Sequence, residues 1–558
     1  MLVSDLRSDT IATGPKGRTA HKHKGGRWED GTMLVRIGTA AAVALVVCVT
    51  AASAQAPKKG GVLNFSIVAE PPTLDCHATT TFATIHPVGP SYNGLLKFRG
   101  DVNKELKVVG DLAKSWEASA DGLTWSFKLH EAVKFHDGTP MTSADVKVSY
   151  ERIIKPPAGV VSARQALHED ITAIETPDAT TVVFRLKKAN ASMLNNFASP
   201  FNCIYSAKKL AENPKYPDTE VMGTGAFKYK EYVKGATYEG VRNPDYFEPG
   251  KPHLDGYKVF IVKSNAVVPG IQGGQFDAEF RGRTPKERDQ LVEAMKDKVQ
   301  VMEGPWTTSL LLVFNTQKKP FDDVRVRRAL TMAIDRWGGS APLSKISFLK
   351  YVGGLSRTGS EFAMPPEELE KLPGYGRDIA KSREEAKKLL AEAGVSNLKI
   401  NFVNRNIAEP YTPGGIYVVD QWKRIGVETN HQQLETKLYF DAQAQGNFDV
   451  TMEFIADYVD DPSIHFQKVV SKAKSSSALP GHTDKLVDEL YDKQAGTLDP
   501  IERRKIVHQL ERHVLDQAYA GMLYWWQRSI VINSKIKGWE LHAAHFTGMD
   551  LQDVWLDQ

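Results

Sequence analysis

The strongest constraint on the fold is an apolar run followed by an amphipathic helix pattern, in LLLVFNTQKKPFDDVRVRRALTMAIDR (residues 310–336). Five consecutive apolar residues, Leu310 to Phe314, are typical of a strand that is buried on both faces. After a turn that contains Pro320, apolar residues recur on one helical face, at positions 326, 329, 330, 333 and 334. A buried strand that leads into a helix predicts an α/β fold, with a new lobe beginning near Asn315.

A second segment, residues 119–154, predicts a hairpin and then a helix. Trp125, Phe127 and Leu129 alternate with polar neighbours, as in a half-buried strand, and Asp-Gly pairs at 121–122 and 137–138 mark turns. Thr142 and Asp145 then resemble a capping box with Asp in place of Glu, just before a helical apolar pattern. Strand and helix patterns alternate in this way along most of the chain.

Two predicted strands of the second lobe end in polar residues. One ends at Asn404-Arg405-Asn406, after a helix that stops at Gly394, and the other, FDVTMEFIAD, ends at Asp457. Ligands of open α/β sheets sit at the carboxyl ends of the strands. We therefore expect Arg405 and Asp457 to face one crevice.

Asp457 opens a cluster of three acids in FIADYVDDPSIHF (residues 454–466), with Asp460 and Asp461. The stretch has no glycine, which a calcium loop needs, and acid/base catalysis would need a partner group that the sequence does not identify. Asp461 precedes Pro462, where a capping role is expected. The chain has no G-x-S-x-G, H-E-x-x-H or phosphate-binding glycine loop. We predict neither an enzyme, nor a metal site, nor a cofactor.

The N-terminal region predicts export. Residues 33–56, MLVRIGTAAAVALVVCVTAASAQA, have the charged, apolar and small-residue regions of a signal peptide; the alternative is an uncleaved membrane anchor. Residues 1–32 are expected to be a non-native or disordered extension. The first 56 residues hold seven Lys and Arg against four Asp and Glu, a net charge of +3. Of the formal net charge of +4, only about +1 therefore remains for the rest of the chain, which argues against a nucleic-acid partner.

Two cysteines, Cys76 and Cys203, would remain after cleavage in an oxidising compartment, where they could pair or stay free. Cys76 also stands near His77 and His86 in DCHATTTFATIHP, which raises a soft-metal alternative, although the spacing fits no zinc pattern.

Several segments resemble one family. They are GGVLNFSIVAEPPTLD (60–75), residues 111–153, GTGAFKYKEYVKGATYEGVRNPDYF (223–247), FNTQKKPFDDVRVRRALTMAID (314–335) and AKKLLAEAG (386–394). In this order they resemble the extracytoplasmic solute-binding proteins of ABC transporters, in the family of dipeptide-, oligopeptide- and nickel-binding proteins (family 5). The resemblance spans most of residues 58–400, whereas DRWGGSAPLSKIS (335–347) departs from it.

The resemblance implies a two-lobed periplasmic-binding-protein fold of the Venus-flytrap type (type II), with an extra subdomain in the first lobe. The expected parts are lobe I at 57–97, 216–314 and 525–558, the extra subdomain at 98–215, and lobe II at 315–524. It also implies a monomer in the periplasm that delivers a solute to an ABC permease with separate ATPase subunits.

For the site, the resemblance places an Asp at the position of Asp457, where oligopeptide-binding members hold the ammonium group of a peptide. The fork of the Arg405 guanidinium would suit the carboxylate. Trp306, Tyr92 and Asn93 are expected to line the cleft, and Asp460 is a further candidate. A peptide or amino-acid-like ligand is favoured over a metal chelate, an opine or a sugar. An exported hydrolase and a sensory or chaperone-like interaction protein stay open.

Overall fold

The computed structural model describes residues 56–103, 106–456, 458–475 and 477–558. Within that range, Ala56–Gln558 forms one compact unit. The expected extension at 1–32, nearly all of the expected signal peptide at 33–56, and Asp457 lie outside the described residues. In the described part of the chain, no helix is both long and apolar enough to cross a membrane.

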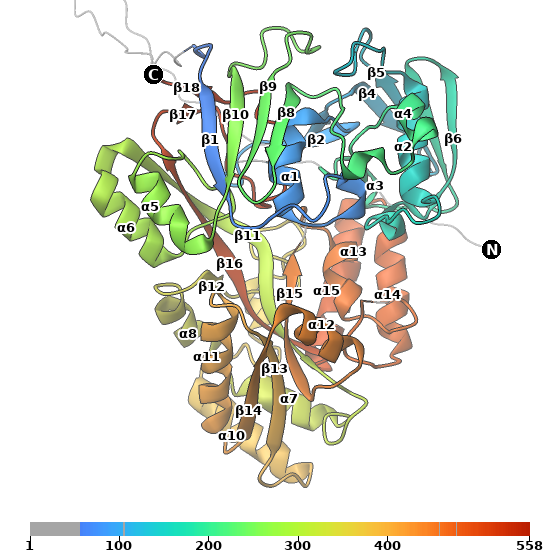
Figure 1. The fold of residues 1–558 in the computed structure, drawn as a ribbon. Coiled ribbons are helices and arrows are strands. Elements are labelled where there is room, and N and C mark those ends of the chain that lie inside the picture. Colours follow the sequence, from blue (N-terminus) through green and yellow to red (C-terminus); the bar gives the residue numbers. More distant parts are fainter. Residues whose placement is uncertain (1–55, 104–105, 457, 476) are drawn as a thin grey trace, which may run out of the picture. The chain divides into compact units, whose positions relative to one another are not determined.

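Lobe I is built on a four-stranded sheet with the order β1-β10-β9-β8 (Figure 1). Its strands are β1 (Val62–Ile67), β8 (Phe227–Val233), β9 (Thr237–Arg242) and β10 (Gly256–Ile261). Strands β1 and β10 are parallel, and the other pairs are antiparallel. The lobe also contains α1 (Phe82–Val88), α5 (Val267–Gln272), α6 (Pro285–Met295), β17 (Ile536–Lys537) and β18 (Trp555–Leu556).

The extra subdomain has its own antiparallel sheet with the order β4-β5-β7-β6. Its elements are β4 (Ala113–Ala118), β5 (Thr124–Leu129), β6 (Ile171–Asp178), β7 (Thr181–Leu186), α2 (Ser143–Ile154), α3 (Met193–Phe197) and α4 (Ala207–Glu212). The short pair β2 (Leu96–Arg99) and β3 (Lys107–Gly110) precedes it in the chain. Because Phe65 of lobe I and Phe127 of the subdomain belong to the same buried cluster, the two parts share one core.

A disulfide between Cys76 and Cys203 ties the first lobe to the subdomain. The residues beside it form a buried polar network. Asp75 accepts hydrogen bonds from the Tyr205 hydroxyl (2.8 Å) and pairs with Arg152 of α2 (2.5 Å). Burial lowers the pKa of His77 to about 4, and its Nε2 bonds the Cys203 carbonyl (2.9 Å). Bond and network together fix the segment that leads into α1.

Lobe II surrounds a six-stranded sheet with the order β12-β16-β11-β15-β13-β14. Its strands are β11 (Val299–Phe314), β12 (Leu349–Tyr351), β13 (Lys399–Arg405), β14 (Glu428–Leu434), β15 (Val450–Ala456) and β16 (Ala520–Asn533). The helices are α7 (Val324–Met332), α8 (Arg336–Leu343), α9 (Pro366–Leu369), α10 (Ile379–Glu392), α11 (Tyr411–Lys423), α12 (Thr436–Ala444), α13 (Pro462–His465), α14 (Lys485–Gly496) and α15 (Pro500–Asp516).

Strands β11 and β16 pass from one core into the other as an antiparallel pair (Figure 1). Residues 299–305 pair with 527–533, where Ile530 and Ile532 belong to the lobe I core. Beyond a register shift between Pro305 and Ser309, residues 309–313 pair with 520–525, and Leu310 belongs to the lobe II core. The change of core therefore falls at 305–309 on one strand and near 525–527 on the other.

The local predictions for these segments are confirmed. Residues 310–314 lie within β11 and are fully buried. All five positions of the predicted apolar face are buried as well, although α7 ends at Met332, so Ala333 and Ile334 lie just beyond the helix. In the subdomain, the side chains of Trp125, Phe127 and Leu129 on β5 point into the core, and Thr142 and Asp145 form the capping box of α2. Apolar spacing and caps were sufficient here because these elements pack by the faces that the sequence marks.

Loss of the disulfide should destabilise the protein. The bond closes a loop with a sequence separation of 127 residues, so the double variant Cys76→Ser, Cys203→Ser should lose about 2–5 kcal/mol of unfolding free energy. Urea titrations of the oxidised wild type, the reduced wild type and the double variant would measure this. Identical midpoints for all three would show that the bond adds nothing to stability.

Candidate functional site

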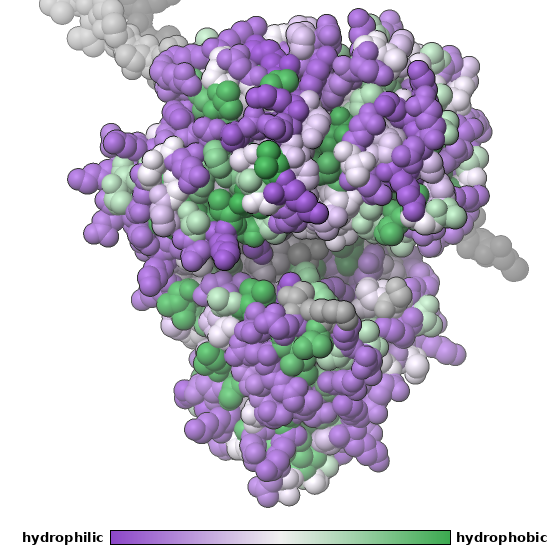
Figure 2. Space-filling model, in the orientation of Figure 1, coloured by the Kyte–Doolittle hydropathy of each residue, from purple (hydrophilic) through white to green (hydrophobic). Residues whose placement is uncertain are grey.

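The candidate site is the edge of the lobe II sheet at which β13 and β15 end. These two strands are parallel, with Val403 opposite Thr451, so their carboxyl ends share that edge. Arg405 is the last residue of β13, and Asp457, outside the described residues, directly follows β15. Thr308, in the stretch of β11 that passes from the lobe I core to the lobe II core, pairs with Ala456. The surface in Figure 2 is hollowed between lobe I and lobe II.

Arg405 lies against two aromatic rings of lobe II. Its guanidinium carbon is 5.6 Å from the ring centroid of Tyr411 and 5.6 Å from that of Phe440. Burial raises the pKa of the Tyr411 hydroxyl, and the nearby Arg405 and Arg281 guanidinium groups act in the opposite direction. A partly exposed guanidinium supported by ring faces is suited to planar anions such as carboxylates.

The three acids of residues 454–466 have different surroundings. Asp460 forms an ion pair with Arg357 (2.7 Å), whose side chain comes from the loop after β12. Asp461 caps α13 and accepts hydrogen bonds from the Ser463 amide (2.9 Å) and the Ser192 hydroxyl (2.7 Å). It also pairs with Arg503 of α15 (3.1 Å). The capping role predicted for Asp461 is confirmed.

The residues around these acids reach into lobe I. Tyr458 belongs to the lobe I cluster, packs against Phe98 (centroids 6.3 Å apart) and donates a hydrogen bond to Asn196 (3.2 Å). The Arg164 guanidinium lies 5.2 Å from the same ring. The segment that follows Asp457 therefore bridges the two lobes.

Aromatic rings pack together where the β11–β16 pair passes from lobe I to lobe II. Trp306 is 1% exposed, donates its indole N–H to His545 Nδ1 (3.0 Å) and packs against Trp526 at a centroid distance of 5.5 Å. Trp526 in turn lies 6.5 Å from Tyr411. Trp525 packs on the other face of the sheet and donates to the Gly354 carbonyl (2.8 Å). Trp306 is thus connected through Trp526 to Tyr411, one of the two rings that support Arg405.

Tyr92 and Asn93 lie in the lobe I core. The Tyr92 hydroxyl accepts a hydrogen bond from the Met222 amide (3.1 Å). The Asn93 amide donates to Asp111 (2.8 Å) and accepts from Thr224 (2.9 Å). They border a small cavity of about 70 Å³. Both polar groups are thus bonded within lobe I.

Lobe I brings a residue to the site that the sequence analysis did not select. Arg281 follows β10 in the chain, and its guanidinium carbon lies 5.1 Å from the Phe82 ring. Burial lowers the pKa of Arg281; Glu279 acts against this change, and the charges of Arg283 and Arg405 add to it. No sequence signal singled it out: in residues 277–283, DAEFRGR, two acids precede two arginines, and the charges alone do not show which arginine lacks a partner.

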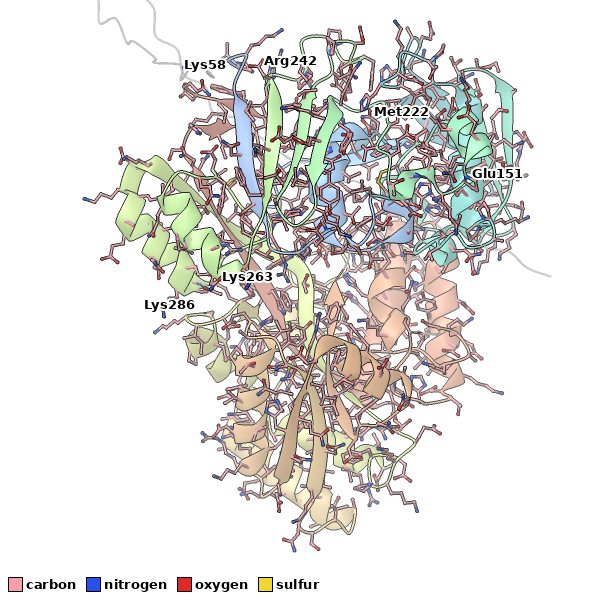
Figure 3. All side chains as sticks on the ribbon, viewed as in Figure 1. Lys58, Glu151, Met222, Arg242, Lys263 and Lys286 are labelled. Atoms are coloured by element: carbon pink, nitrogen blue, oxygen red, sulfur yellow. A yellow bond between two sulfur atoms is a disulfide. The ribbon has the colours of Figure 1, made fainter. Side chains whose placement is uncertain are left out.

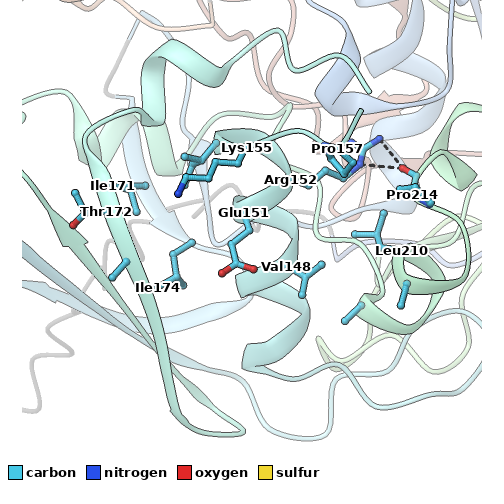
Figure 4. Close-up of a pocket in the computed structure, with 14 residues that line it drawn as sticks. Val148, Glu151, Arg152, Lys155, Pro157, Ile171, Thr172, Ile174, Leu210 and Pro214 are labelled. Carbon is cyan, nitrogen blue, oxygen red and sulfur yellow. Dashed lines mark hydrogen bonds between the residues drawn. The ribbon is translucent and has the colours of Figure 1, made fainter. Parts of the chain in front are cut away.

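The subdomain contains a larger cavity of about 490 Å³ between α2, β6 and α4 (Figure 4). Its lining is mainly apolar, including Val148, Ile171 and Leu210, and Figure 3 places Glu151 at the side of lobe I. Its Arg152 is already engaged by Asp75 and the Pro214 carbonyl. Since Arg405 and Trp306 do not line it, we assign the site to the strand ends instead.

The soft-metal alternative gains no support from the described residues. Cys76 is bonded to Cys203, and His86 is buried, which lowers its pKa to about 4, with Nε2 bonded to the His545 carbonyl (2.6 Å). Across the described ranges, no group of three or more His, Cys, Asp or Glu side chains is placed to hold a metal ion.

Two cores joined by one strand pair, with strand ends facing the crevice between them, define a two-lobed solute-binding protein. The profile of the bacterial extracellular solute-binding proteins, family 5, matches residues 107–477. The chain belongs to this family, so the predicted fold class and the family resemblance are both confirmed.

Three individual proteins illustrate the likeness. The probable D,D-dipeptide-binding periplasmic protein of Escherichia coli K12 is 26% identical over 89% of this chain and 94% of its own. Di/tripeptide-binding protein 2 of Pseudomonas aeruginosa UCBPP-PA14 is 31% identical over 63% of this chain and 67% of its own. The periplasmic binding protein AgaA of A. tumefaciens R10, solved with agropinic acid, has a TM-score of 0.72 and 24% identity, and the match covers 89% of this chain and 99% of that chain.

The Asp461–Arg503 pair should contribute strongly to stability. Burial alone would raise the pKa of Asp461, but Arg503 and Ser192 hold it below its usual value. The stabilisation is therefore present above the unfolded pKa of about 3.9 and is lost as the pH falls through the lower folded pKa. Asp461→Asn should cost about 3–5 kcal/mol at pH 7, because Arg503 would remain buried without its counter-charge.

Denaturant titrations of this variant and the wild type at pH 7 and pH 3 would test the prediction. Asp245→Asn is the matched control, because the Asp245 side chain is 60% exposed and 3.8 Å from its nearest cation. A variant as stable as the wild type at pH 7 would contradict the assigned role of the pair.

Proposed function

We propose that this protein is the extracytoplasmic substrate-binding component of an ABC importer. It captures a small solute, most favourably a peptide or an amino-acid-like compound, between its two lobes and delivers it to a permease with separate ATPase subunits. Family membership supports this role, as do relatives whose names specify dipeptides and tripeptides. The observation that carries the proposal is the shared edge at which β13 and β15 end, with Arg405 on one strand and Asp457 after the other.

Opposite charges at this edge suit a zwitterion. The carboxylate of Asp457 would bind the ammonium group of the solute, and the guanidinium of Arg405 would bind its carboxylate. Both contacts are charge-assisted hydrogen bonds, which strengthen when a closing crevice excludes water. Trp306, Trp526 and Tyr411 are buried and form the apolar packing on which this edge rests.

Binding is coupled to movement of the lobes. The β11–β16 pair is the chain connection at which the core changes, and its register shift at 305–309 is the natural place for bending. A solute that contacts both lobes binds the closed form better than the open form and so shifts the equilibrium toward closure. The permease would then recognise the closed protein.

The expected signal peptide at 33–56 supports export to the periplasm, where the protein would act as a monomer. An opine is the second candidate ligand, because a structural relative was solved with agropinic acid. The sequence has no catalytic motif that would favour a hydrolase.

Removing either charge should weaken binding without unfolding the protein. Asp457→Asn and Arg405→Gln should each weaken binding of a free dipeptide at least about 30-fold, because each leaves one charge of the ligand without a partner. Calorimetry would first identify ligands among dipeptides, tripeptides, opines and sugars, and then compare the variants.

Matched controls come from α11 of the same lobe. Asp420 and Arg424 pair with each other at 2.9 Å, and their side chains are 50% and 52% exposed, so Asp420→Asn and Arg424→Gln should bind like the wild type. On the ligand side, an N-acetylated dipeptide should bind the wild type about as weakly as the free dipeptide binds Asp457→Asn. A C-amidated dipeptide should bind the wild type about as weakly as the free dipeptide binds Arg405→Gln. If no compound in the panel bound or raised the melting temperature, the import role would be contradicted.

A further inference from the structure

Arg281, beside the crevice, has no ion pair of its own among the described residues. Its neighbour Glu279 is already used: the carboxylate pairs with Arg283 and accepts the amides of Arg281 (3.1 Å) and Gly282 (3.2 Å). Among the residues that the structure describes, Arg281 Nε has no hydrogen-bond partner, and no ion pair involves its guanidinium group. Desolvating an arginine in this way is costly unless an anion compensates its charge.

Arg281 shares its surroundings with Arg405 of the opposite lobe. A continuous series of ring contacts leads from one to the other: Phe82 lies 6.0 Å from His545, which lies 5.4 Å from Trp306, and Trp306 leads through Trp526 to Tyr411 beneath Arg405. The charges of both arginines also act on Tyr411. Lobe I and lobe II therefore each present a guanidinium group to the same region.

Three carboxylates described on the segments around the crevice are paired with cations of their own and do not balance this second charge. These pairs are Glu279 with Arg283, Glu453 with Lys468 (2.6 Å) and Asp460 with Arg357 (2.7 Å). Burial raises the pKa of Glu409, although a hydrogen bond with Ser347 acts against the change, and no ion pair or hydrogen bond among the described residues links Glu409 to Arg281.

The proposed zwitterion cannot supply the missing charge either. Its ammonium group would be matched by Asp457 and its carboxylate by Arg405, which leaves Arg281 uncompensated. One more negative group on the solute would complete the balance. It would also remove the repulsion between the two arginines, which acts against closure of the lobes while the crevice holds no anion.

We propose that the solute is acidic, with a second carboxylate or equivalent anionic group that Arg281 binds from lobe I. The substrate class is a peptide or amino-acid derivative that contains a glutamyl or aspartyl side chain, or another dicarboxylate of similar size. This inference rests on the proposed solute-binding function and refines its substrate class. Arg281 is then the residue that selects acidic solutes over neutral ones.

Matched dipeptide pairs test the proposal directly. Ala-Glu is compared with Ala-Gln, and Glu-Ala with Gln-Ala, by calorimetry at pH 7 and low salt. The members of each pair differ in one carboxylate against one amide. The wild type should bind at least one glutamyl peptide about tenfold or more tightly than its glutaminyl partner, as expected for a charge-assisted contact.

Variants assign that preference to Arg281. In Arg281→Gln the preference should fall to less than about twofold, and Arg281→Lys should retain part of it. Arg242→Gln is the control, because Arg242 is paired with Asp255 (2.8 Å) and lies on lobe I at the end remote from lobe II (Figure 3). It should keep the full preference. Unfolding midpoints would confirm that all variants are folded.

The possible failures are distinguishable. If the glutaminyl peptides bind as tightly as the glutamyl ones, or if the preference survives in Arg281→Gln, the acidic substrate class is wrong while the solute-binding function stands. If neither pair binds, and the wider panel of opines, sugars and tripeptides does not bind either, the proposed function fails and this inference fails with it.

Discussion

The antiparallel pairing of β11 with β16 is the interaction on which the rest of the structure depends. Each strand contributes one end to the lobe I core and the other to the lobe II core, so one ladder of strand pairing joins the two cores. The register shift between Pro305 and Ser309 interrupts that ladder where the cores change. Rigid packing on both sides of a locally irregular strand pair favours motion of whole lobes over internal deformation.

Sequence patterns predicted those parts of the fold that are stabilised by their own neighbours in the chain. The apolar run at 310–314, the face of α7 and the cap at Thr142 identify buried elements without any knowledge of their partners. The return of the C-terminal residues to lobe I was expected only from the family resemblance, since pairing between residues 300 and 532 depends on contacts that no local pattern encodes.

The site was predictable to a similar extent. Strand polarity correctly placed Arg405 at a carboxyl end, because parallel strands align their ends by geometry. The following Pro462 marked Asp461 as a cap, but the ion-pair partners of Asp460 and Asp461 could not be predicted, because Arg357 and Arg503 come from distant segments. The Arg281 side chain was missed for the same reason: the feature that distinguishes it, the lack of an ion pair among the described residues, becomes visible only when the partners of Glu279 are known.

The discontinuity of lobe I has a consequence for biogenesis. Its core combines β1, near the start of the described chain, with Ile530, Ile532 and Leu541 near the end. A chain that is threaded across a membrane from its N-terminus therefore cannot complete this core until residues 527–558 have followed. The part of the six-stranded sheet that packs in lobe II lies almost entirely before these residues in the chain, so lobe II can assemble earlier, and the first lobe in sequence is the last to be finished.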